Sequence, residues 1–541
     1  MFVRIKTTPN SPRRSVQLVE GVRDGGKVRQ RIVRHIGVAM DEDELERLRR
    51  LGEYVKAKLE DEHQPSLFAP DTIADQVIRV GRQGDGKLPV DLKQLEEEQR
   101  LITGIHEVYG EMYRQLGLDG LLPRSRYRAS HDALFHVVMA RIANPDSKRG
   151  SVRRLEEDFG VSLPLEKVYR MMDQLDAPVI NHLRRRVGEA SRSLLPVAVL
   201  FFDCTTLYFE TAVEDELRQH GFSKDGKHRD SQVLLALMVT REGLPISYEV
   251  FPGSTYEGHS LVPVLQDMQR RHQVERAVCV RGMLSAANLD AMDKIGGEYV
   301  VGARLRTLPV ALQKQVLETD AYVPLEGSED RRVGEWEHKG RRLIVVFCPK
   351  RARKDAYERR HQVQRLLERL KRNPKELLSH HGAKRFIAVE GDARLTVNPE
   401  KIAEAERWDG LAGVVTNLRD ASTAEVMAHY HGLWQVEESF RITKHDLKVR
   451  PIWHWNENRI RIAIAFMAFA CVRHLAYRVA IQKKRMSPEV IRSALVHRQC
   501  SVLSCRQSGN RYVIPSKPTP VAEQIYATMG LPLTITPYQL V

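Results

Sequence analysis

The alternation of apolar and polar positions divides the chain into a strand-rich start, a helical middle and a mixed α/β stretch. Residues 1–38 alternate as strands do, and Asp24-Gly25-Gly26 marks a hairpin turn. Residues 41–63 repeat leucine at helical spacing, which predicts a charged amphipathic helix. A linker that contains Pro and Gly follows, and further helices are expected over about 93–118 and 130–143.

Two short helical segments within residues 151–175 are joined by a turn at Gly160. Pro164 stands at the start of the second segment, where a helix tolerates proline. This arrangement is typical of a helix-turn-helix, and the basic run Ser147-Lys148-Arg149 beside it favours DNA binding. An ordinary helical hairpin has the same pattern, so the sequence leaves both interpretations open.

From residue 196 the pattern predicts the order β-β-β-α-β-α-β. The apolar run Val197–Phe202 ends on Asp203 and is typical of a buried central strand, with Asp203 expected at the strand end. The elements expected after it are strands over 232–240 and 245–251, a helix over 260–271, a strand over 276–280, a helix over 285–294 and a strand from 298.

The remainder of the chain contains a long interruption and two further helices. Residues 303–428 mix strand-like pieces with a charged helix, about 351–373, and are expected to form a β-containing lobe of their own. An apolar helix over 459–480 is expected to pack the end of the domain, and residues from about 506 read as a loosely structured tail.

The segment from Tyr430 to Lys444 predicts a single helix that carries unusual chemistry on one face. Tyr430, Glu437, Arg441 and Lys444 fall at helical offsets that stack along that face, with Trp434 between them. A carboxylate can hold a hard cation, and the basic residues can hold phosphates. The face therefore suits a metal ion beside a nucleic-acid backbone.

Composition supports a polyanionic partner. The 541 residues include 85 Lys and Arg against 70 Asp and Glu, a formal net charge of +15. No apolar run of membrane-spanning length is found, the start lacks the apolar core of a signal peptide, and the six cysteines are scattered as cytosolic thiols are. We therefore expect a cytoplasmic protein with no membrane partner.

Four motifs together resemble the insertion-sequence transposases of bacteria, of the DDE type. They are Leu200-Phe-Phe-Asp-Cys-Thr-Thr-Leu-Tyr-Phe-Glu210, Gly221-Phe-Ser-Lys-Asp-Gly, Arg281-Gly-Met-Leu-Ser-Ala-Ala-Asn-Leu289 and Tyr430…Glu437…Lys444. The likeness covers nearly the whole chain and is closest to the branch with a β-rich insertion and a Tyr…Glu…Lys catalytic helix. The fold class that it implies is α/β, a ribonuclease-H-like mixed sheet flanked by helices and interrupted by the insertion. An N-terminal β-hairpin and a helical DNA-binding region would precede it.

The resemblance also implies a chemistry and a site. Two Mg²⁺ ions, with Mn²⁺ as a substitute, would activate the attacking water and stabilise the leaving oxygen. Asp203 and Glu437 would be the catalytic, metal-binding acids, and Tyr430, Arg441 and Lys444 would contact DNA phosphates. The alternatives are a loop acid at Asp203, a solvated acid at Glu437 and a solvated lysine at Lys444. The expected partners are the terminal repeats of the element and its target DNA, bound by a homodimer.

Two places depart from the family pattern. The second catalytic Asp is expected directly before Arg281, where this chain has Val280; Asp290, on the next helix, is expected to face away. A family His after Arg459-Ile-Arg is missing as well, and Leu433 replaces a frequent Arg. Both gaps read as if a short piece were absent, which suggests an altered copy or an acid supplied from elsewhere.

The domain boundaries that follow are 1–63 for the hairpin and helix, 64–92 for the linker, 93–190 for the helical DNA-binding region, 191–302 and 429–482 for the catalytic core, 303–428 for the insertion and 483–541 for the tail. The leading hypothesis is a transposase that binds element ends, cleaves DNA and transfers the 3′ ends to target DNA. The alternatives are a non-catalytic DNA-binding derivative and an unrelated ribonuclease-H-like nuclease. Trp408 and Trp434 could stack on bases, but core packing is the preferred interpretation for both.

Overall fold

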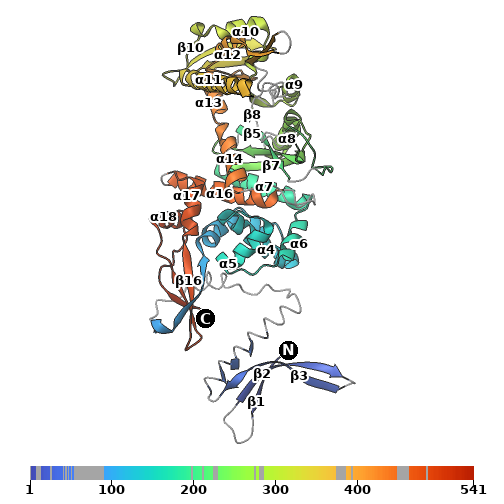
Figure 1. Ribbon diagram of the computed structural model, residues 1–541, viewed down its shortest axis with the longest axis vertical. Coiled ribbons are helices and arrows are strands. Elements are labelled where there is room, and N and C mark those ends of the chain that lie inside the picture. Colours follow the sequence, from blue (N-terminus) through green and yellow to red (C-terminus); the bar gives the residue numbers. More distant parts are fainter. Residues whose placement is uncertain are drawn as a thin grey trace. The chain divides into compact units, whose positions relative to one another are not determined.

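The computed structural model describes most of the chain and divides it into two compact units, 1–179 with 478–541 and 180–477 (Figure 1). The described residues are 2–7, 14–24, 27–39, scattered positions between 42 and 56, 91–195, 199–209, 213–222, 229–272, 276–279, 285–372, 386–390, 394–447, 462–482 and 485–540. Residues 64–90 of the predicted linker therefore lie outside the described residues. So do some side chains within these ranges, including that of Lys444.

A three-stranded antiparallel sheet opens the first unit, as the alternation predicts. Its strands are β1 (Phe2–Thr7), β2 (Arg14–Asp24) and β3 (Lys27–Ala39), and Asp24 pairs with Lys27 across the predicted turn. The described residues of the predicted 41–63 helix are helical. Leu45 and Leu48 of that helix pack against the sheet, so the leucine stripe is its buried face.

The helix expected from residue 93 is wrong at its start. Residues Leu95–Ile102 form strand β4, which pairs antiparallel with β16 (Gln499–Cys505) near the other end of the chain. The run Glu96-Glu97-Glu98 favours a helix locally, but pairing with β16 and burial of Leu101 outweigh that weak preference.

The predicted loose tail is also wrong. Residues 488–540 fold as α17 (Pro488–Val496), β16, β17 (Arg511–Pro515), α18 (Pro520–Met529) and β18 (Tyr538–Leu540). The sheet order β18-β17-β16-β4 buries Cys500, Val502 and Val513 in one small core. The apolar stripe of this segment is short, and its strand partner is remote, which is why it does not stand out in the sequence.

The middle of the first unit is helical. Ser147 caps α5, and Gly160 ends it with φ 66°, a conformation that favours glycine. Helices α4, α5 and α6 pack on one another, which confirms the two predicted helices and the turn at Gly160. The helical elements of this stretch are η1 (Leu92–Gln94), η2 (Ile105–Tyr109), α3 (Gly110–Gln115), η3 (Leu118–Gly120), α4 (Arg124–Ala143), α5 (Lys148–Phe159) and α6 (Leu165–Asp173). Helix α7 (Ala177–Leu194) follows, and most of it belongs to the second unit.

A nine-stranded mixed sheet organises the second unit, in the order β10-β11-β12-β15-β9-β8-β5-β6-β7. Strand β5 pairs antiparallel with β6 and parallel with β8, which in turn pairs parallel with β9. The predicted order β-β-β-α-β-α-β is confirmed by β5 (Val199–Tyr208), β6 (Gln232–Val239), β7 (Pro245–Pro252), α8 (Glu257–His272), β8 (Arg276–Cys279), α9 (Ala286–Lys294) and β9 (Glu298–Gly302).

Most strands of residues 303–428 extend the core sheet, whereas β13 and β14 pair with each other in a separate two-stranded sheet. Strand β15 pairs with β9 of the core, and β12 pairs with β15. Burial of Leu343, Val345 and Val415 in the main core explains this continuity. The other elements of the region are η5 (Leu305–Thr307), α10 (Val310–Leu317), η6 (Thr319–Ala321), β10 (Val323–Pro324), β11 (Arg332–His338), β12 (Arg341–Phe347), α11 (Pro349–Arg372), β13 (Ile387–Glu390), β14 (Arg394–Val397), α12 (Pro399–Glu406) and β15 (Leu411–Thr416).

Helix α16 (Ala463–Gln482) is long and apolar enough to cross a membrane, judged by length and composition alone. Of its most apolar 18-residue window, 78% is buried inside the protein, as in a core helix. Met467, Ala468 and Leu475 are fully buried, in agreement with the predicted core stripe.

Candidate active site

Asp203 lies inside strand β5, not at its end. The strand continues to Tyr208 because the residues after Asp203 still pair with β6. The side chain is 8% exposed, and its Oδ1 accepts a hydrogen bond of 2.7 Å from the backbone N–H of Cys204. The buried strand holds this carboxylate rigidly.

Strand alternation decides which face of the sheet Asp203 occupies. Phe202 and Cys204 point into the core that includes residues of α8, so Phe201 and Asp203 point to the opposite face. On that face Gly432, just before α14 (Trp434–Arg441), lies against the Phe201 ring, where an added Cβ would approach Phe201 Cζ to 2.6 Å. Helix α14 packs on β5 and β6, so Glu437 belongs to the element that covers the Asp203 face.

The predicted single helix over 430–444 is interrupted twice. Helix α13 (Thr423–His431) ends at Gly432, α14 begins at Trp434, and a π-helical turn η9 (Ile442–Asp446) follows. Between α13 and α14 the backbone N–H of Gln435 bonds to the Gly432 carbonyl, three residues back, which tightens the chain locally. Residues spaced as on one regular helix therefore do not all share one face over the whole segment.

Tyr430, Trp434 and Glu437 nevertheless reach one hollow. It has a volume of about 320 Å³ and is also lined by Arg331, Val346, Cys348, Arg351, Gly410, Ala412, Met427, His431 and Leu433. Glu437 is exposed and forms no ion pair with any residue that the structure describes. A carboxylate placed this way can accept a ligand without first breaking a protein contact.

The predicted phosphate contacts differ in their surroundings. Arg441 forms ion pairs with Glu438 at 3.9 Å and with Asp446 at 3.6 Å, and its side chain is 55% exposed. At that exposure both pairs are weak, so Arg441 can still exchange them for a phosphate. The backbone of Lys444 lies in η9, but its side chain lies outside the described residues.

Residue Val280, where the second acid is expected, lies outside the described residues. Strand β8, which leads to it, ends at Cys279 opposite Phe202, one residue before Asp203 on the neighbouring strand. The sequence therefore places Val280 directly after the strand that adjoins Asp203.

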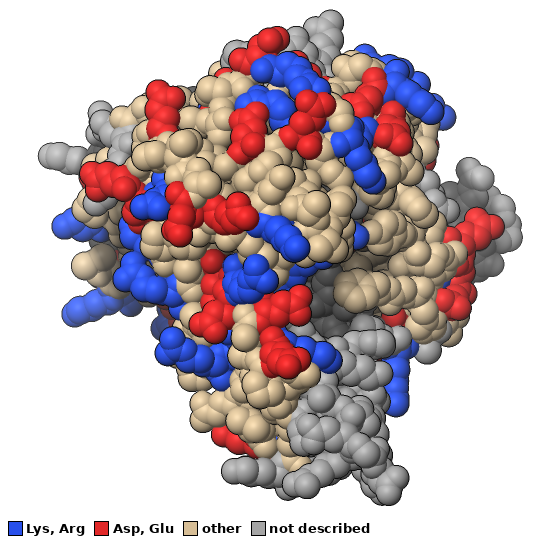
Figure 2. Space-filling model, turned by 90° about the horizontal axis from the view of Figure 1, so that it is seen from above, with Lys and Arg blue, Asp and Glu red and all other residues tan. Residues whose placement is uncertain are grey.

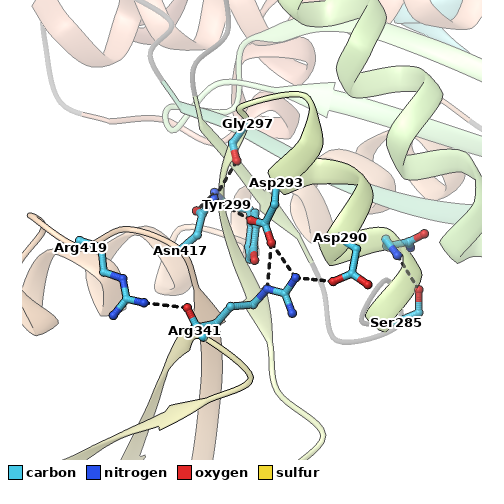
Figure 3. Close-up of polar contacts among 10 residues, drawn as sticks. Ser285, Asp290, Asp293, Gly297, Tyr299, Arg341, Asn417 and Arg419 are labelled. Atoms are coloured by element: carbon cyan, nitrogen blue, oxygen red, sulfur yellow. Dashed lines mark hydrogen bonds and ion pairs between the residues drawn. The ribbon is translucent and has the colours of Figure 1, made fainter.

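Asp290 is committed to another contact, as Figure 3 shows. The Arg341 guanidinium, on β12, donates to Asp290 Oδ1 at 2.6 Å and to Asp293 Oδ2 at 2.6 Å. Arg341 itself is buried, and removing one carboxylate from a buried guanidinium is costly. Asp290 thus ties α9 to β12, in agreement with the expectation that it faces away from the site.

Sequence reasoning missed the support behind α14. Glu438 reads as a solvated acid, yet its Oε2 lies 3.6 Å from the buried guanidinium of Arg473, on α16. Arg473 also donates to Gln435 Oε1 at 3.2 Å and to the carbonyl oxygens of Glu242 and Gly243, both at 2.8 Å. A charged residue within the apolar 463–480 stripe is the sequence signal that could have revealed this contact.

The two tryptophans have different environments. Trp408 is 7% exposed within the main core, so the core interpretation is confirmed for it. Trp434 is 44% exposed at the hollow, so the core interpretation is wrong for this residue. Trp434 begins α14, whose buried residues are Gln435, Val436, Ser439 and Phe440.

The basic run Ser147-Lys148-Arg149, at the start of α5, carries less positive charge for phosphate binding than its sequence indicates. Burial, together with the charge of Arg141, lowers the pKa of Lys148 to about 7. At neutral pH this lysine is therefore only partly charged in the free protein. The exposed Arg149 is the more suitable phosphate contact of the pair.

Among the residues that the structure describes, no group of three or more His, Cys, Asp and Glu side chains is placed to hold a metal ion. Asp203 and Glu437 remain as two carboxylates on packed elements. Cys204, Cys348, Cys471, Cys500 and Cys505 form no disulfide bond within the described residues.

Comparisons with known proteins agree with the motifs. Residues 198–472 match the family model described as the transposase DDE domain, and residues 3–66 match the N-terminal domain of IS1634 family transposases. A Sinorhizobium fredii (strain NBRC 101917 / NGR234) protein, y4zB, named provisionally as a transposase, is 30% identical over 122 residues. That match spans 22% of this chain and only about a third, 34%, of the relative.

A solved structure, the Mos1 mariner paired end complex with Mn, is similar over 42% of this chain and 65% of its own, at 12% identity. Its TM-score of 0.13 is too low to support a fold assignment. The family models carry the assignment instead, since the DDE model alone covers about half of the chain and the second model covers its start. This chain belongs to the insertion-sequence transposases of the DDE type.

Proposed function

We propose that this chain binds the terminal repeats of an insertion sequence and descends from an enzyme that cleaves those ends and transfers them to target DNA. The observation that carries the proposal is the relation between Asp203 and Glu437. A buried strand supplies the first carboxylate, and the helix packed on the same face of the sheet supplies the second.

The order of the core strands supports a ribonuclease-H-like arrangement. Three antiparallel neighbours, β7, β6 and β5, are followed in the sheet by β8 and β9, both parallel to β5. Numbered along the chain, these strands lie in the sheet in the order third, second, first, fourth, fifth, which is the order of that fold. The strands contributed by residues 303–428 would then be an extension of the core sheet at the β9 edge.

The two acids fit a divalent cation. Carboxylate oxygens are hard ligands, and Mg²⁺ takes one or two of them while keeping waters and substrate oxygens as its other ligands. Asp203 is held by its strand, and Glu437 has no competing ion pair among the described residues. When bound, Mg²⁺ or Mn²⁺ would activate the attacking water and stabilise the leaving oxygen.

The residues of the chain supply the positioning. Asp203 and Glu437 would hold the divalent cation and, through it, the reacting phosphate. Tyr430, Arg441 and Lys444 would hold neighbouring phosphates and so keep the scissile bond in line. Charge-assisted contacts of this kind fix geometry as well as affinity.

The alternative function is a non-catalytic DNA-binding derivative. It is favoured by Val280, which puts an apolar side chain where the second acid is expected. With two carboxylates a second cation would be poorly neutralised, so we propose that binding persists while cleavage is weak. In either case the protein would act on chromosomal DNA, in the cytoplasm, as a homodimer on paired ends.

The test is a pair of assays on DNA that flanks the gene. Retention of end fragments over random fragments, weakening steeply with salt, is the result that DNA-end recognition predicts. Nicking of the same fragments in the presence of Mg²⁺ separates the enzyme from the derivative. Equal retention of end and random fragments would contradict end recognition.

A further inference from the structure

A second, larger hollow adjoins the one that Glu437 lines. It has a volume of about 590 Å³, and Arg351, Ala412 and Tyr430 line both hollows. Arg304 and Arg306, before and within η5, line only the second.

Two guanidinium groups line the hollow next to Glu437. Arg331 precedes β11, and Arg351 lies in the first turn of α11, so both come from residues 303–428. Nε of Arg351 lies 3.6 Å from Oδ2 of Asp355, and the Arg351 side chain is 53% exposed. An ion pair at this exposure is weak, so a phosphate can replace Asp355 as the partner of Arg351. In the larger hollow, Arg359 is already compensated by Asp409 and by Glu406 at 3.4 Å.

Arg331 has a neighbouring carboxylate, Asp330, with which it interacts electrostatically, but that carboxylate is paired with Lys350 at 3.3 Å. Nη1 of Arg331 lies 2.7 Å from Nε2 of His431, and Arg331 forms no ion pair within the part of the chain that the structure describes. Partial removal of the His431 ring from water, with the charges of Arg331 and Arg351, lowers the pKa of His431. The imidazole is therefore neutral at pH 7 and accepts a hydrogen bond from Arg331 without neutralising it.

We propose that this hollow binds backbone phosphates of a DNA strand that runs past Glu437, with Arg331 and Arg351 as guanidinium contacts. The inference rests on the proposed function and adds residues outside the Tyr…Glu…Lys helix. Two guanidiniums face one carboxylate here, and guanidinium forks match phosphate oxygens. The exposed Trp434 ring at the same hollow offers an apolar wall beside them.

The face shown in Figure 2 is not uniformly basic, since its Lys and Arg side chains are interspersed with Asp and Glu side chains. The inference therefore rests on the two arginines at the hollow and not on a general basic surface. This makes single substitutions informative.

The first experiment measures binding of the full-length chain to a fluorescein-labelled 40-bp duplex of random sequence, without divalent metal, across a salt series. Arg331→Gln and Arg351→Gln should each weaken binding about tenfold, which corresponds to the lower limit for a charged hydrogen bond. Each should also reduce the salt slope by about 0.9, as expected for one lost phosphate contact.

Arg369→Gln is the matched control, because Arg369 is exposed on the same helix, α11, and lines neither hollow. It removes the same charge but should leave the slope nearly unchanged. If Arg331→Gln and Arg351→Gln behave as Arg369→Gln does, while the parent chain binds DNA, the inference is wrong and the proposed function stands. If the parent chain binds no DNA, both are wrong.

The second experiment uses Cys348, which lines the hollow and is only partly buried, whereas Cys204, Cys471, Cys500 and Cys505 are buried. Labelling of Cys348 by N-ethylmaleimide, followed by peptide mass spectrometry, should slow severalfold when the 40-bp duplex is bound. In the Arg331→Gln, Arg351→Gln double variant, Cys348 should be labelled as fast with DNA as without it, even at DNA concentrations high enough to saturate the variant. Unchanged labelling of Cys348 at saturating DNA would overturn the proposal.

Discussion

The guanidinium of Arg473 lies 3.6 Å from the carboxylate of Glu438, the residue next to Glu437 on helix α14. The same guanidinium bonds to the carbonyls of Glu242 and Gly243 in the turn between β6 and β7. A buried charge thus joins α16, α14 and the sheet. The orientation of the candidate catalytic helix depends on this contact as well as on apolar packing.

Gly243→Ala should destabilise the second unit. Gly243 has φ 79°, and an added Cβ would lie 1.9 Å from Arg473 Nη2. We expect a loss of about 1–3 kcal/mol in the free energy of unfolding, from backbone strain and displacement of Arg473. Urea unfolding measures it. Gly340→Ala is the control, because φ is 73° there but no atom lies near the added Cβ. An equal loss in both variants would show that strain alone acts.

Arg473→Met should cost about 3 kcal/mol, because Glu438 and two carbonyl groups lose a buried partner. Arg441→Met removes an exposed arginine from the neighbouring face and should cost less than about 1 kcal/mol. The free energy of urea unfolding compares the two variants. Similar losses would indicate that the Arg473 contact is no stronger than a surface ion pair.

The first unit should lose stability in acid because of His106. Burial, with the charge of His136, lowers the pKa of His106 well below its usual value, and Nε2 of His106 lies 3.1 Å from Nδ1 of His136. The unfolded chain takes up this proton near pH 6.5, so the contribution is complete above that pH. As the pH falls below 6.5, the free energy of unfolding of the first unit should decrease by up to about 1.4 kcal/mol per pH unit.

Thermal unfolding between pH 7.5 and 5 checks this expectation. His106→Gln removes the titrating ring, so the midpoint temperature of this variant should fall less with pH than that of the parent chain. His361→Gln, at a ring that packs on Tyr357 in the second unit, should behave as the parent does. Parallel pH profiles for all three proteins would exclude His106 as the cause.

The sequence predicts the buried elements well and the remote pairings poorly. The strand at Asp203 and the helices at Gly160 follow from local apolar spacing and turn chemistry, both of which are visible in a single stretch of chain. Strand β4 and the 488–540 segment depend on each other across about 400 residues, and local propensity favours a helix for β4. No local pattern could have revealed that pairing.

The candidate site was predictable in its residue types but not in its surroundings. Asp203 and Glu437 stand out because each carboxylate interrupts an apolar pattern. The breaks at Gly432 and at η9, and the approach of Arg331 to His431, depend on packing between segments about 100 residues apart. The role of each acid remains a prediction that chemistry must test.

Lys444→Ala should reduce cleavage and end binding while leaving the fold intact. A contact between a charged side chain and a phosphate is worth roughly 1.5–3 kcal/mol, or about tenfold or more in rate or affinity. The measurement is nicking of element ends by a chain with the second acid restored. Lys314→Ala, at an exposed lysine on α10, is the control and should have no effect. An unchanged nicking rate would make Lys444 an ordinary solvated lysine.

The chain has Asp203 and Glu437 but has Val280 where the second catalytic acid is expected. The direct measurement is nicking of supercoiled plasmid DNA that carries the element ends, with Mg²⁺ or Mn²⁺, by three proteins. They are the chain as written, Val280→Asp, and a variant with Ala-Asp inserted after Val280. Strand β8 ends at Cys279, so the insertion, which lengthens this strand, should restore more activity than the substitution.

We predict weak or no nicking by the chain as written, and metal-dependent nicking by the insertion variant that Asp203→Asn or Glu437→Gln abolishes. Robust metal-dependent nicking by the unmodified chain would contradict the account, because another residue would then complete the site.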